Sequence, residues 1–287
     1  MEIKKVAVIG GGLMGRQIGL NTAIYNYEVY LYDAFEAARA AVKDWEDTYL
    51  AGRIAKGRMT EEKVAGIRQR FHIVDTMEAA VTGADLVIEA VPEREDLKHQ
   101  VLKEASLYAK PECIIATNSS FMVSSLFKED VKDPAKLCNC HYYNPALVMK
   151  FVEVVCNDET SEDTAETMRA FCLATGKTPA VMPKEIDGFI ANRILRVINN
   201  ESKWLVENGY CTWEEIDLAC ENGLGHPMGP FRLNDLTGID LSYQIMLNRY
   251  EESGEKPAMF DIYEQMVKEG RLGRKSGRGF YDYTEKK

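Results

Sequence analysis

The sequence predicts an α/β protein, with an N-terminal doubly wound sheet that carries an inserted helical hairpin and with an all-α C-terminal domain. Three observations lead to this fold class. A short apolar run, a glycine-rich turn and a helical pattern open the chain. From Phe35 the apolar spacing becomes that of two helices. Near 183–187 the strand patterns stop and only helical ones continue. A chain of 287 residues can form two domains, which we place at 1–185 and 186–287.

The first elements form a βαβ unit. Residues 6–9 are apolar without alternation, as in a strand that is buried on both faces of a sheet. The glycine-rich turn at 10–15 follows at once, and a helix continues to about Tyr25. A second strand covers 28–32 and ends at Asp33. This arrangement places the turn between a strand and a helix, where glycines have a specific use.

The glycines of this turn match the requirements of a Rossmann-type nucleotide site. Gly10 permits the tight turn, Gly12 lets a pyrophosphate approach the backbone, and Gly15 lets helix and strand pack closely. Leu13 and Met14 open the helix, whose free N–H groups and positive dipole favour phosphate. The turn therefore predicts a dinucleotide cofactor. The alternative is a glycine turn of purely structural use.

Asp33 indicates which dinucleotide this is. An acid at the end of the second strand can accept hydrogen bonds from a ribose diol, and it would repel a 2′-phosphate. We therefore expect NAD rather than NADP.

The segment after the first βαβ unit has the pattern of a helical hairpin. Between 35 and 49 apolar residues recur every three or four positions, which gives a narrow stripe on one long helix. Thr60 is placed to cap a second helix. Arg53, Lys56 and Arg58 surround the expected tip. Their spacing alone favours charges that are simply solvated.

The α/β alternation then resumes. The segments 85–91, 113–117 and 151–155 have the composition of strands, and 97–108 and 160–176 have the pattern of helices. From Asp187 onward the chain is predicted to be helical.

Among the four histidines, His141 is the candidate catalytic residue. It ends the apolar run 137–140 at a strand-to-loop junction. Glu153 interrupts another apolar strand, where a carboxylate is costly to bury unless it is paired. A histidine held by such a carboxylate suits a general base that takes a hydroxyl proton while hydride leaves for a nicotinamide. The alternatives are a structural histidine and a carboxylate on the solvent side of an edge strand. The positions of His72, His99 and His226 are explained by ordinary structural roles.

Two further polar groups are candidates for ligand contact. Asn118, Ser119 and Ser120 directly follow the strand 113–117, and the carboxyl ends of such strands are where these sheets bind ligands. Asn and Ser are also ordinary turn residues. Asn192 lies early in an apolar helical pattern, and Asn is a poor interior helix former, so we expect it to have a tertiary partner, either structural or substrate.

Composition excludes several classes of function. The net charge of −10 without a basic tail argues against a nucleic-acid binder. No apolar run is long enough to cross a bilayer, and the N-terminus lacks the pattern of a secretory signal, so we expect a cytoplasmic protein. Seven scattered cysteines without CxxC pairs indicate reduced thiols and no metal site.

At these residues the sequence resembles the short-chain L-3-hydroxyacyl-CoA dehydrogenases, in particular their bacterial 3-hydroxybutyryl-CoA dehydrogenase branch. The resemblance covers the whole chain. The motifs that carry it are Gly10 to Gly15, Glu89-Ala90-Val91-Pro92-Glu93, Thr117-Asn118-Ser119-Ser120, His141-Tyr142-Tyr143-Asn144-Pro145, Val148 to Glu153, Gly188 to Arg193, His226-Pro227-Met228-Gly229-Pro230 and Gly273 to Tyr281.

The resemblance implies a Rossmann domain that binds NAD, a helical C-terminal domain that forms a homodimer, and an acyl-CoA thioester substrate in the cleft between them. It gives His141 the role of base, with Glu153 as its partner, and it implies that Ser120 and Asn192 hold the C3 oxygen and thioester region of the substrate. It places Arg53, Lys56 and Arg58 at the phosphates of coenzyme A, which reverses the interpretation as solvated charges. The other residues that match cofactor or active-site contacts are Asp33, Glu93, Lys98, Asn118 and Asn144.

The chain departs from the usual family pattern at four places. Phe121 and Met122 replace part of the usual Asn-Thr-Ser-Ser-Leu, so the serine role is assigned to Ser120 by its spacing to His141. Two tyrosines, Tyr142 and Tyr143, replace phenylalanines, Leu147 stands where a second proline is usual, and Asp187 also replaces a proline. The changes at Phe121 and Met122 and at Leu147 touch the acyl pocket, so they leave open the preferred chain length and the dependence on coenzyme A. The sequence also leaves open the physiological direction and the oligomer beyond a dimer. A dehydrogenase of a non-CoA hydroxy acid and a non-catalytic NADH-binding relative remain alternatives.

Overall fold

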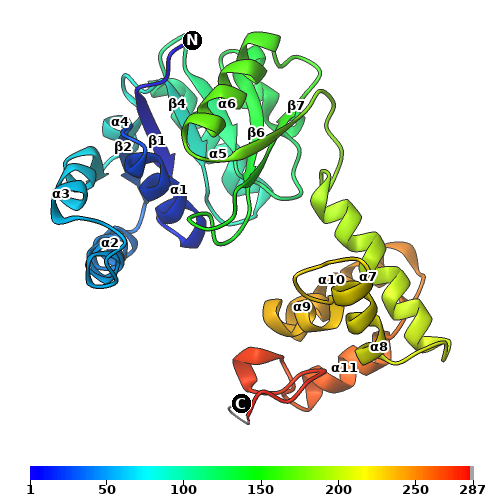
Figure 1. The fold of residues 1–287 in the computed structure, drawn as a ribbon. Coiled ribbons are helices and arrows are strands. Elements are labelled where there is room, and N and C mark those ends of the chain that lie inside the picture. Colours follow the sequence, from blue (N-terminus) through cyan, green and yellow to red (C-terminus); the bar gives the residue numbers. More distant parts are fainter. Residues whose placement is uncertain (285–287) are drawn as a thin grey trace. The chain divides into compact units, whose positions relative to one another are not determined.

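The computed structural model describes residues 1–284, which divide into two compact units with the boundary between Ile190 and Ala191 (Figure 1). The first unit is a sheet flanked by helices, and the second unit is helical. This confirms the predicted fold class of a doubly wound sheet with a helical hairpin and an all-α C-terminal domain.

The sheet of the first unit has eight strands in the order β3-β2-β1-β4-β5-β6-β7-β8. Neighbouring strands are parallel except β6 and β7, which are antiparallel. The strand order reverses between β1 and β4, and sheets of this kind bind ligands at the carboxyl ends of the strands beside such a reversal. The strands are β1 (Lys5–Ile9), β2 (Glu28–Tyr32), β3 (Phe71–Val74), β4 (Leu86–Glu89), β5 (Ile114–Thr117), β6 (Leu137–Tyr142), β7 (Phe151–Cys156) and β8 (Thr178–Met182).

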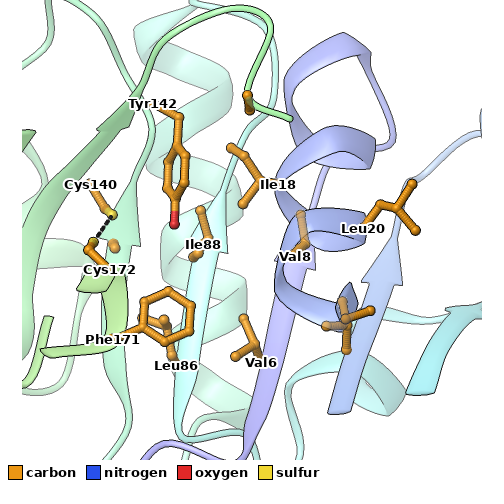
Figure 2. Close-up of a cluster of buried hydrophobic side chains, with 14 of the residues drawn as sticks. Val6, Val8, Ile18, Leu20, Leu86, Ile88, Cys140, Tyr142, Phe171 and Cys172 are labelled. Atoms are coloured by element: carbon orange, nitrogen blue, oxygen red, sulfur yellow. Dashed lines mark hydrogen bonds between the residues drawn. The ribbon is translucent and has the colours of Figure 1, made fainter. Parts of the chain in front are cut away.

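Helices cover both faces of the sheet, and β1 shows why its sequence does not alternate. Val6 and Val8 pack on the core under α1, α2, α3 and α6, part of which is drawn in Figure 2, whereas Ala7 and Ile9 pack under α4, α5 and η1. Both cores exclude water, so all four of these side chains are apolar. The helical segments of this unit are α1 (Leu13–Ile24), α2 (Glu36–Ala55), α3 (Glu61–Arg70), α4 (Met77–Val81), α5 (Glu95–Tyr108), η1 (Ser124–Asp130), η2 (Pro134–Lys136) and α6 (Glu162–Ala174).

The predicted hairpin consists of α2 and α3. The Thr60 hydroxyl accepts a hydrogen bond from the backbone N–H of Lys63 at 3.2 Å, so the predicted cap is confirmed. Lys56 and Arg58 lie exposed in the turn between the helices. The Arg53 guanidinium lies 6.0 Å from the centre of the Tyr49 ring, so it partly packs on its own helix.

The main differences from the predicted elements are two boundaries and one additional strand. Strand β4 ends at Glu89 rather than at 91. Strand β8 was not predicted, because Pro179 and partly exposed side chains give it no buried apolar pattern; as the last strand of the sheet it tolerates a proline. Helix α7 begins at Ala191, because Gly188 (φ 71°) and Phe189 (φ 46°) have left-handed backbone. Asn192 therefore lies in a first helical turn, and the prediction that it occupies an unfavourable interior position of the helix is wrong.

The second unit packs its helices around aromatic side chains. The Phe280 ring contacts Trp213, Phe231 and Tyr263, and the Asp235 carboxylate accepts the backbone N–H groups of Phe280 at 2.9 Å and Tyr281 at 3.0 Å. These bonds tie the C-terminal segment to the helices. The helical segments are α7 (Ala191–Glu207), α8 (Trp213–Leu218), η3 (Ala219–Gly223), α9 (Pro230–Thr237), α10 (Ile239–Ser253), α11 (Phe260–Lys268) and η4 (Arg274–Ser276).

The seven cysteines are all free thiols, and only Cys211 is partly exposed. The sulfurs of Cys140 and Cys172 lie 4.0 Å apart within the core (Figure 2). Residues 1–284 contain no cluster of His, Cys, Asp and Glu side chains suited to a metal ion. Within the same residues no helix is long and apolar enough to cross a membrane.

Candidate active site

The glycine turn between β1 and α1 has the geometry that a dinucleotide needs. Gly10 has φ 109°, and a Cβ there would lie 2.6 Å from the carbonyl oxygen of Ala90. A Cβ on Gly15 would lie 1.9 Å from the carbonyl oxygen of Gly10, so helix and strand approach as closely as only glycine allows. A Cβ on Gly12 would meet nothing within 4 Å, and no side chain caps α1. The residues thus leave room and free N–H groups for phosphates.

Asp33 lies directly beside this turn. Its Oδ2 accepts the backbone N–H of Gly11 at 2.7 Å, and its Oδ1 accepts the N–H of Phe35 at 3.0 Å. The carboxylate is thereby fixed at the carboxyl end of β2, which is the position from which an acid meets a nucleotide ribose. Because the phosphates belong over β1 and this ribose over β2, a nicotinamide would lie on the other side, over β4, β5 and β6.

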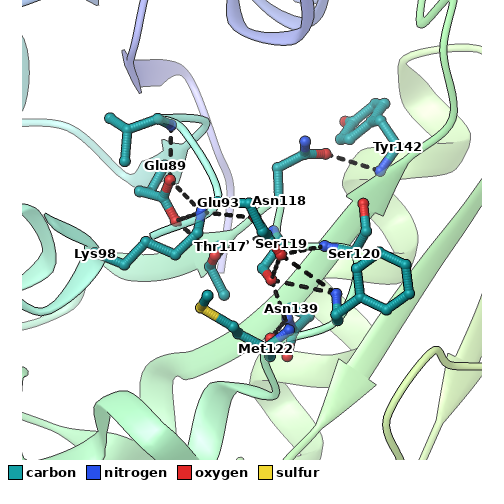
Figure 3. Close-up of polar contacts among 12 residues, drawn as sticks. Glu89, Glu93, Lys98, Thr117, Asn118, Ser119, Ser120, Met122, Asn139 and Tyr142 are labelled. Carbon is teal, nitrogen blue, oxygen red and sulfur yellow. Dashed lines mark hydrogen bonds and ion pairs between the residues drawn. The ribbon is translucent and has the colours of Figure 1, made fainter. Parts of the chain in front are cut away.

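A buried ion pair occupies that side of the sheet (Figure 3). The Lys98 ammonium donates to both carboxylate oxygens of Glu89, at 2.7 and 2.9 Å. Glu89 also accepts the Thr117 hydroxyl at 2.6 Å and the Val91 N–H at 2.7 Å. Glu89 and Lys98 are 0% and 1% exposed, so this pair is held in a low dielectric and is fully hydrogen-bonded.

Glu93 connects the ion pair to the turn after β5. Its Oε2 lies 3.4 Å from the Lys98 ammonium, and its Oε1 accepts the Ser119 hydroxyl and, at 3.1 Å, the Ser120 N–H (Figure 3). Burial works to raise the pKa of Glu93, but the Ser119 hydrogen bond and the Lys98 charge outweigh it, so the pKa lies below its ordinary value. An ionised Glu93 therefore lies beside Ser120. Asn118 links β5 to β6, because its Oδ1 accepts the Tyr142 N–H at 2.9 Å.

His141 and Glu153 lie opposite each other on the antiparallel strands β6 and β7. The His141 Nδ1 and the Glu153 Oε2 are 2.9 Å apart, and the two residues are 3% and 0% exposed. The interpretation of Glu153 as a solvent-facing carboxylate on an edge strand is therefore wrong, since β7 lies between β6 and β8. A carboxylate only accepts hydrogen bonds, so Nδ1 donates and Nε2 of the neutral ring is left with a lone pair for a proton.

Other groups surround this pair. The Tyr143 hydroxyl donates to the same Glu153 Oε2 at 2.7 Å, and the Ile190 N–H donates to Oε1 at 2.9 Å. The rings of Tyr143 and Phe189 lie 4.5 and 5.5 Å from the His141 ring. The segment before α7 therefore helps to hold the pair.

Two other histidines have structural partners. The His72 ring stacks on Tyr30 at 4.6 Å and lies 3.1 Å from a Glu28 carboxylate oxygen. His99 pairs with Asp130. His226 lies in the loop between η3 and α9.

The first unit thus brings most of the predicted site residues to one edge of the sheet: the glycine turn, Asp33, Glu93, Lys98, Asn118, Ser120, His141 and Glu153. Asn144 is exposed in the loop after β6, the basic residues lie at the hairpin tip, and Asn192 lies in the second unit.

Sequence reasoning missed Glu89, Thr117 and Tyr143. Glu89 could have been found in the same way as Glu153, because it is also a carboxylate in an apolar strand. The sequence signal for Tyr143 was weaker: it has a hydroxyl at a position where the family usually has a phenylalanine.

One doubly wound sheet carries both a nucleotide-binding turn and a histidine that is held by a carboxylate. This combination is typical of an NAD-dependent dehydrogenase. Comparison with known proteins agrees with this class and narrows it. Residues 5–186 match the NAD-binding domain of 3-hydroxyacyl-CoA dehydrogenase, and residues 188–283 match the C-terminal domain of that enzyme. The chain belongs to the 3-hydroxyacyl-CoA dehydrogenase family, which confirms the family resemblance and NAD as the cofactor.

Individual relatives cover nearly the whole chain. A Bacillus subtilis protein named "Probable 3-hydroxybutyryl-CoA dehydrogenase" is 38% identical over 100% of this chain and 99% of its own. The solved structure of an (S)-3-hydroxybutyryl-CoA dehydrogenase from Ralstonia eutropha has a TM-score of 0.88 and 31% identity, covering 99% and 100% of the two chains. A diketoreductase structure has a TM-score of 0.88 and 29% identity with the same coverage.

Proposed function

We propose that the protein interconverts (S)-3-hydroxyacyl-CoA and 3-ketoacyl-CoA with NAD(H), and that its substrate is short, such as 3-hydroxybutyryl-CoA. The observation that carries this proposal is the buried His141–Glu153 pair on β6 and β7, in the same sheet as the glycine turn. The names of the similar proteins support the substrate class.

In the oxidation, His141 takes the proton of the C3 hydroxyl on Nε2, and the resulting imidazolium is stabilised by Glu153 through Nδ1. When bound, NAD⁺ would supply the acceptor for the hydride that leaves C3. In the reduction, the imidazolium returns its proton to the developing alkoxide. Glu153 holds the tautomer and the orientation of the ring in both directions.

The remaining site residues are proposed to bind and orient. Ser120 donates its hydroxyl to the C3 oxygen, and Asn192 offers its amide to the thioester region. Glu93, Lys98 and Asn118 lie on the nicotinamide side of the sheet and hold that half of the cofactor together with Asn144, while the glycine turn and Asp33 hold the other half.

The hairpin between β2 and β3 is proposed to bind the coenzyme A part of the substrate. Lys56 and Arg58 are exposed at its tip and Arg53 lies one turn before it, so three cations are available for the phosphates. We further propose that residues 1–185 form the cofactor domain, that 186–287 form the substrate and homodimer domain, and that the protein is cytoplasmic.

A dehydrogenase of a substrate without coenzyme A is the second candidate. It is favoured by the likeness to a diketoreductase and by the replacements at Phe121, Met122, Leu147 and Asp187. The discriminating experiment measures NADH oxidation with 3-ketoacyl-CoA thioesters of increasing length and with the matching free acids and diketones. Strong activity on acetoacetyl-CoA and little on the free acids is expected. The reverse ranking would replace the proposed substrate class.

A further inference from the structure

The Tyr143 hydroxyl, which the usual family motif lacks, shares one carboxylate oxygen with the His141 ring. Oε2 of Glu153 accepts from Tyr143 at 2.7 Å and lies 2.9 Å from His141 Nδ1. The Tyr143 ring also lies 4.5 Å from the His141 ring. We propose that Tyr143 is a positioning residue that lowers the proton affinity of His141 by drawing charge from Glu153, and so extends alcohol oxidation to lower pH.

The physical reason is competition for one acceptor. A hydroxyl that donates to a carboxylate stabilises its anionic form and takes up part of its charge. Less charge then remains to stabilise the imidazolium, so His141 stays neutral at lower pH. Oxidation needs the neutral ring as a base, and reduction needs the protonated ring as an acid. The hydroxyl therefore moves the pH range of both directions: oxidation extends to lower pH, and reduction ends at lower pH.

Tyr143 is able to act in this way because it remains a donor. Burial raises the pKa of its hydroxyl, and the hydrogen bond to Glu153 raises it further, so the phenol keeps its proton over the working range. The contact is fixed by neighbouring strands rather than by a loop alone, since the ring of Tyr143 also packs at 5.7 Å on Phe151 of β7.

Apart from the hydroxyl of Tyr142 on β6, which is removed only in the control variant, the other titratable groups near the pair are the same in all variants compared below. Strands β5 and β8 on either side carry none. The groups on the other neighbouring segments are Cys138 and Cys140 on β6, Cys156 on β7, Lys150 in the loop between them, and Lys184, Glu185 and Asp187 in the segment that leads to Phe189. Glu185 accepts the Ser125 N–H at 3.2 Å.

The adjacent tyrosine provides a matched control. Tyr142 is the next residue on β6, and its side chain points to the opposite face, into the core beside Ile18 and Ile88 (Figure 2). Tyr142→Phe and Tyr143→Phe remove the same atom from neighbouring residues, but only the second change removes a donor to Glu153.

The test is a proton titration of His141 itself. The protein has four histidines, so a sample labelled with ¹³C at the histidine Cε1 gives few signals, and the His141 signal is identified by its loss in His141→Gln. In Tyr143→Phe the titration midpoint should move to higher pH by about half a unit or more. In Tyr142→Phe it should stay at the wild-type value. Equal midpoints in Tyr143→Phe and wild type, or an equal shift in Tyr142→Phe, would overturn the proposal.

Kinetics give a second readout, which rests on the proposed function. In Tyr143→Phe the acidic limb of kcat/KM for 3-hydroxybutyryl-CoA oxidation should move to higher pH by the same amount, and acetoacetyl-CoA reduction should persist to higher pH. A purely structural role of Tyr143 would lower kcat without moving either limb. If the wild type fails to turn over these thioesters, the proposed substrate is wrong, and the NMR titration still decides the role of Tyr143.

Discussion

At the scale of single residues, the site is built from carboxylates that the fold buries and then satisfies. Glu153 is met by donors from three separate segments: His141 on β6, Tyr143 in the following loop and Ile190 before α7. An uncompensated carboxylate at 0% exposure would cost several kcal/mol, so each donor contributes to stability as well as to orientation.

Replacing the proposed base should slow the chemical step and leave the binding of the cofactor unchanged. His141→Gln keeps a polar side chain but removes the group that accepts and returns the proton, so kcat should fall by roughly a hundredfold or more. The Kd for NADH, followed by fluorescence, should stay near the wild-type value, because the glycine turn and Asp33 are untouched. Near-normal turnover in this variant would show that His141 is not the base.

The helical unit contains a buried lysine whose removal should stabilise the protein. Lys203 is 8% exposed, and burial lowers its pKa from 10.5 to about 8. Between these two values the unfolded chain binds more protons, so the free energy of unfolding rises with pH from about 8 to 10.5 and carries the full penalty below 8. Lys203→Met should therefore stabilise at neutral pH by on the order of 2–3 kcal/mol.

Urea unfolding at pH 7 and near pH 10 measures this effect as a difference between variant and wild type. The gain should shrink at the higher pH. A loss of stability at neutral pH would instead show that the contacts of the ammonium with Met246 (3.4 Å) and the Tyr263 ring (4.5 Å) outweigh its desolvation.

Sequence reasoning reached some of these residues and not others, for identifiable reasons. Glu153 was predicted because a carboxylate among apolar strand residues needs a partner, and the strand register then placed it opposite His141. The same reasoning applies to Glu89, a carboxylate at the end of the apolar strand β4. The hydrogen bond from the Tyr143 hydroxyl to Glu153 was beyond prediction, because it depends on how the chain turns after β6 and not on any periodic pattern.

At the scale of elements, strong patterns were predicted well and irregular ones were not. Strand β1 and the hairpin helices have an apolar pattern over many residues. Strand β8 pairs with β7 through its backbone although Pro179 weakens its signal, and the start of α7 is set by two residues with positive φ, one of them Phe189. Positive φ at a phenylalanine is a tertiary effect, since sterics disfavour it locally.

The hairpin tip offers a test of coenzyme A recognition. Replacing Arg53, Lys56 and Arg58 together by Ser should raise KM for acetoacetyl-CoA by up to about a hundredfold at low salt, since each exposed charge contact contributes about 1 kcal/mol. High salt should mimic the change in the wild type.

Two controls make this result specific. A pantetheine thioester lacks the adenosine phosphates, so wild type and variant should handle it alike. Lys103→Ser removes an exposed charge from α5, on the opposite face of the sheet, and should leave KM unchanged. A normal KM of the triple variant for acetoacetyl-CoA at low ionic strength would show that the three charges at the tip are only solvated and do not bind coenzyme A.

At the scale of the whole molecule, the helical unit has large apolar side chains that are exposed and not packed in its own core. On α7, Ile194 and Val197 are 57% and 67% exposed, and Leu241 and Ile245 on α10 are both 54% exposed. Large apolar side chains exposed in this way are available to pack against another protein. This supports the proposed homodimer.

Charge introduced on α7 should therefore disrupt association. We expect Ile194→Glu combined with Val197→Glu to shift the sedimentation coefficient from that of a dimer to that of a monomer. Leu107→Glu alters a side chain of similar exposure (65%) on α5 of the first unit and should leave the dimer intact. A monomeric wild type, or a double variant that still dimerises, would refute this assignment.

The distribution of thiols has a practical consequence for such measurements. Because six cysteines are buried and Cys211, between α7 and α8, is partly exposed, a maleimide probe should react first at that one position in the unmodified protein. A nitroxide attached there would give one spin per chain. In a homodimer the two spins would be related by symmetry, so a single dipolar distance would report the spacing of the helical units with no substitution at all.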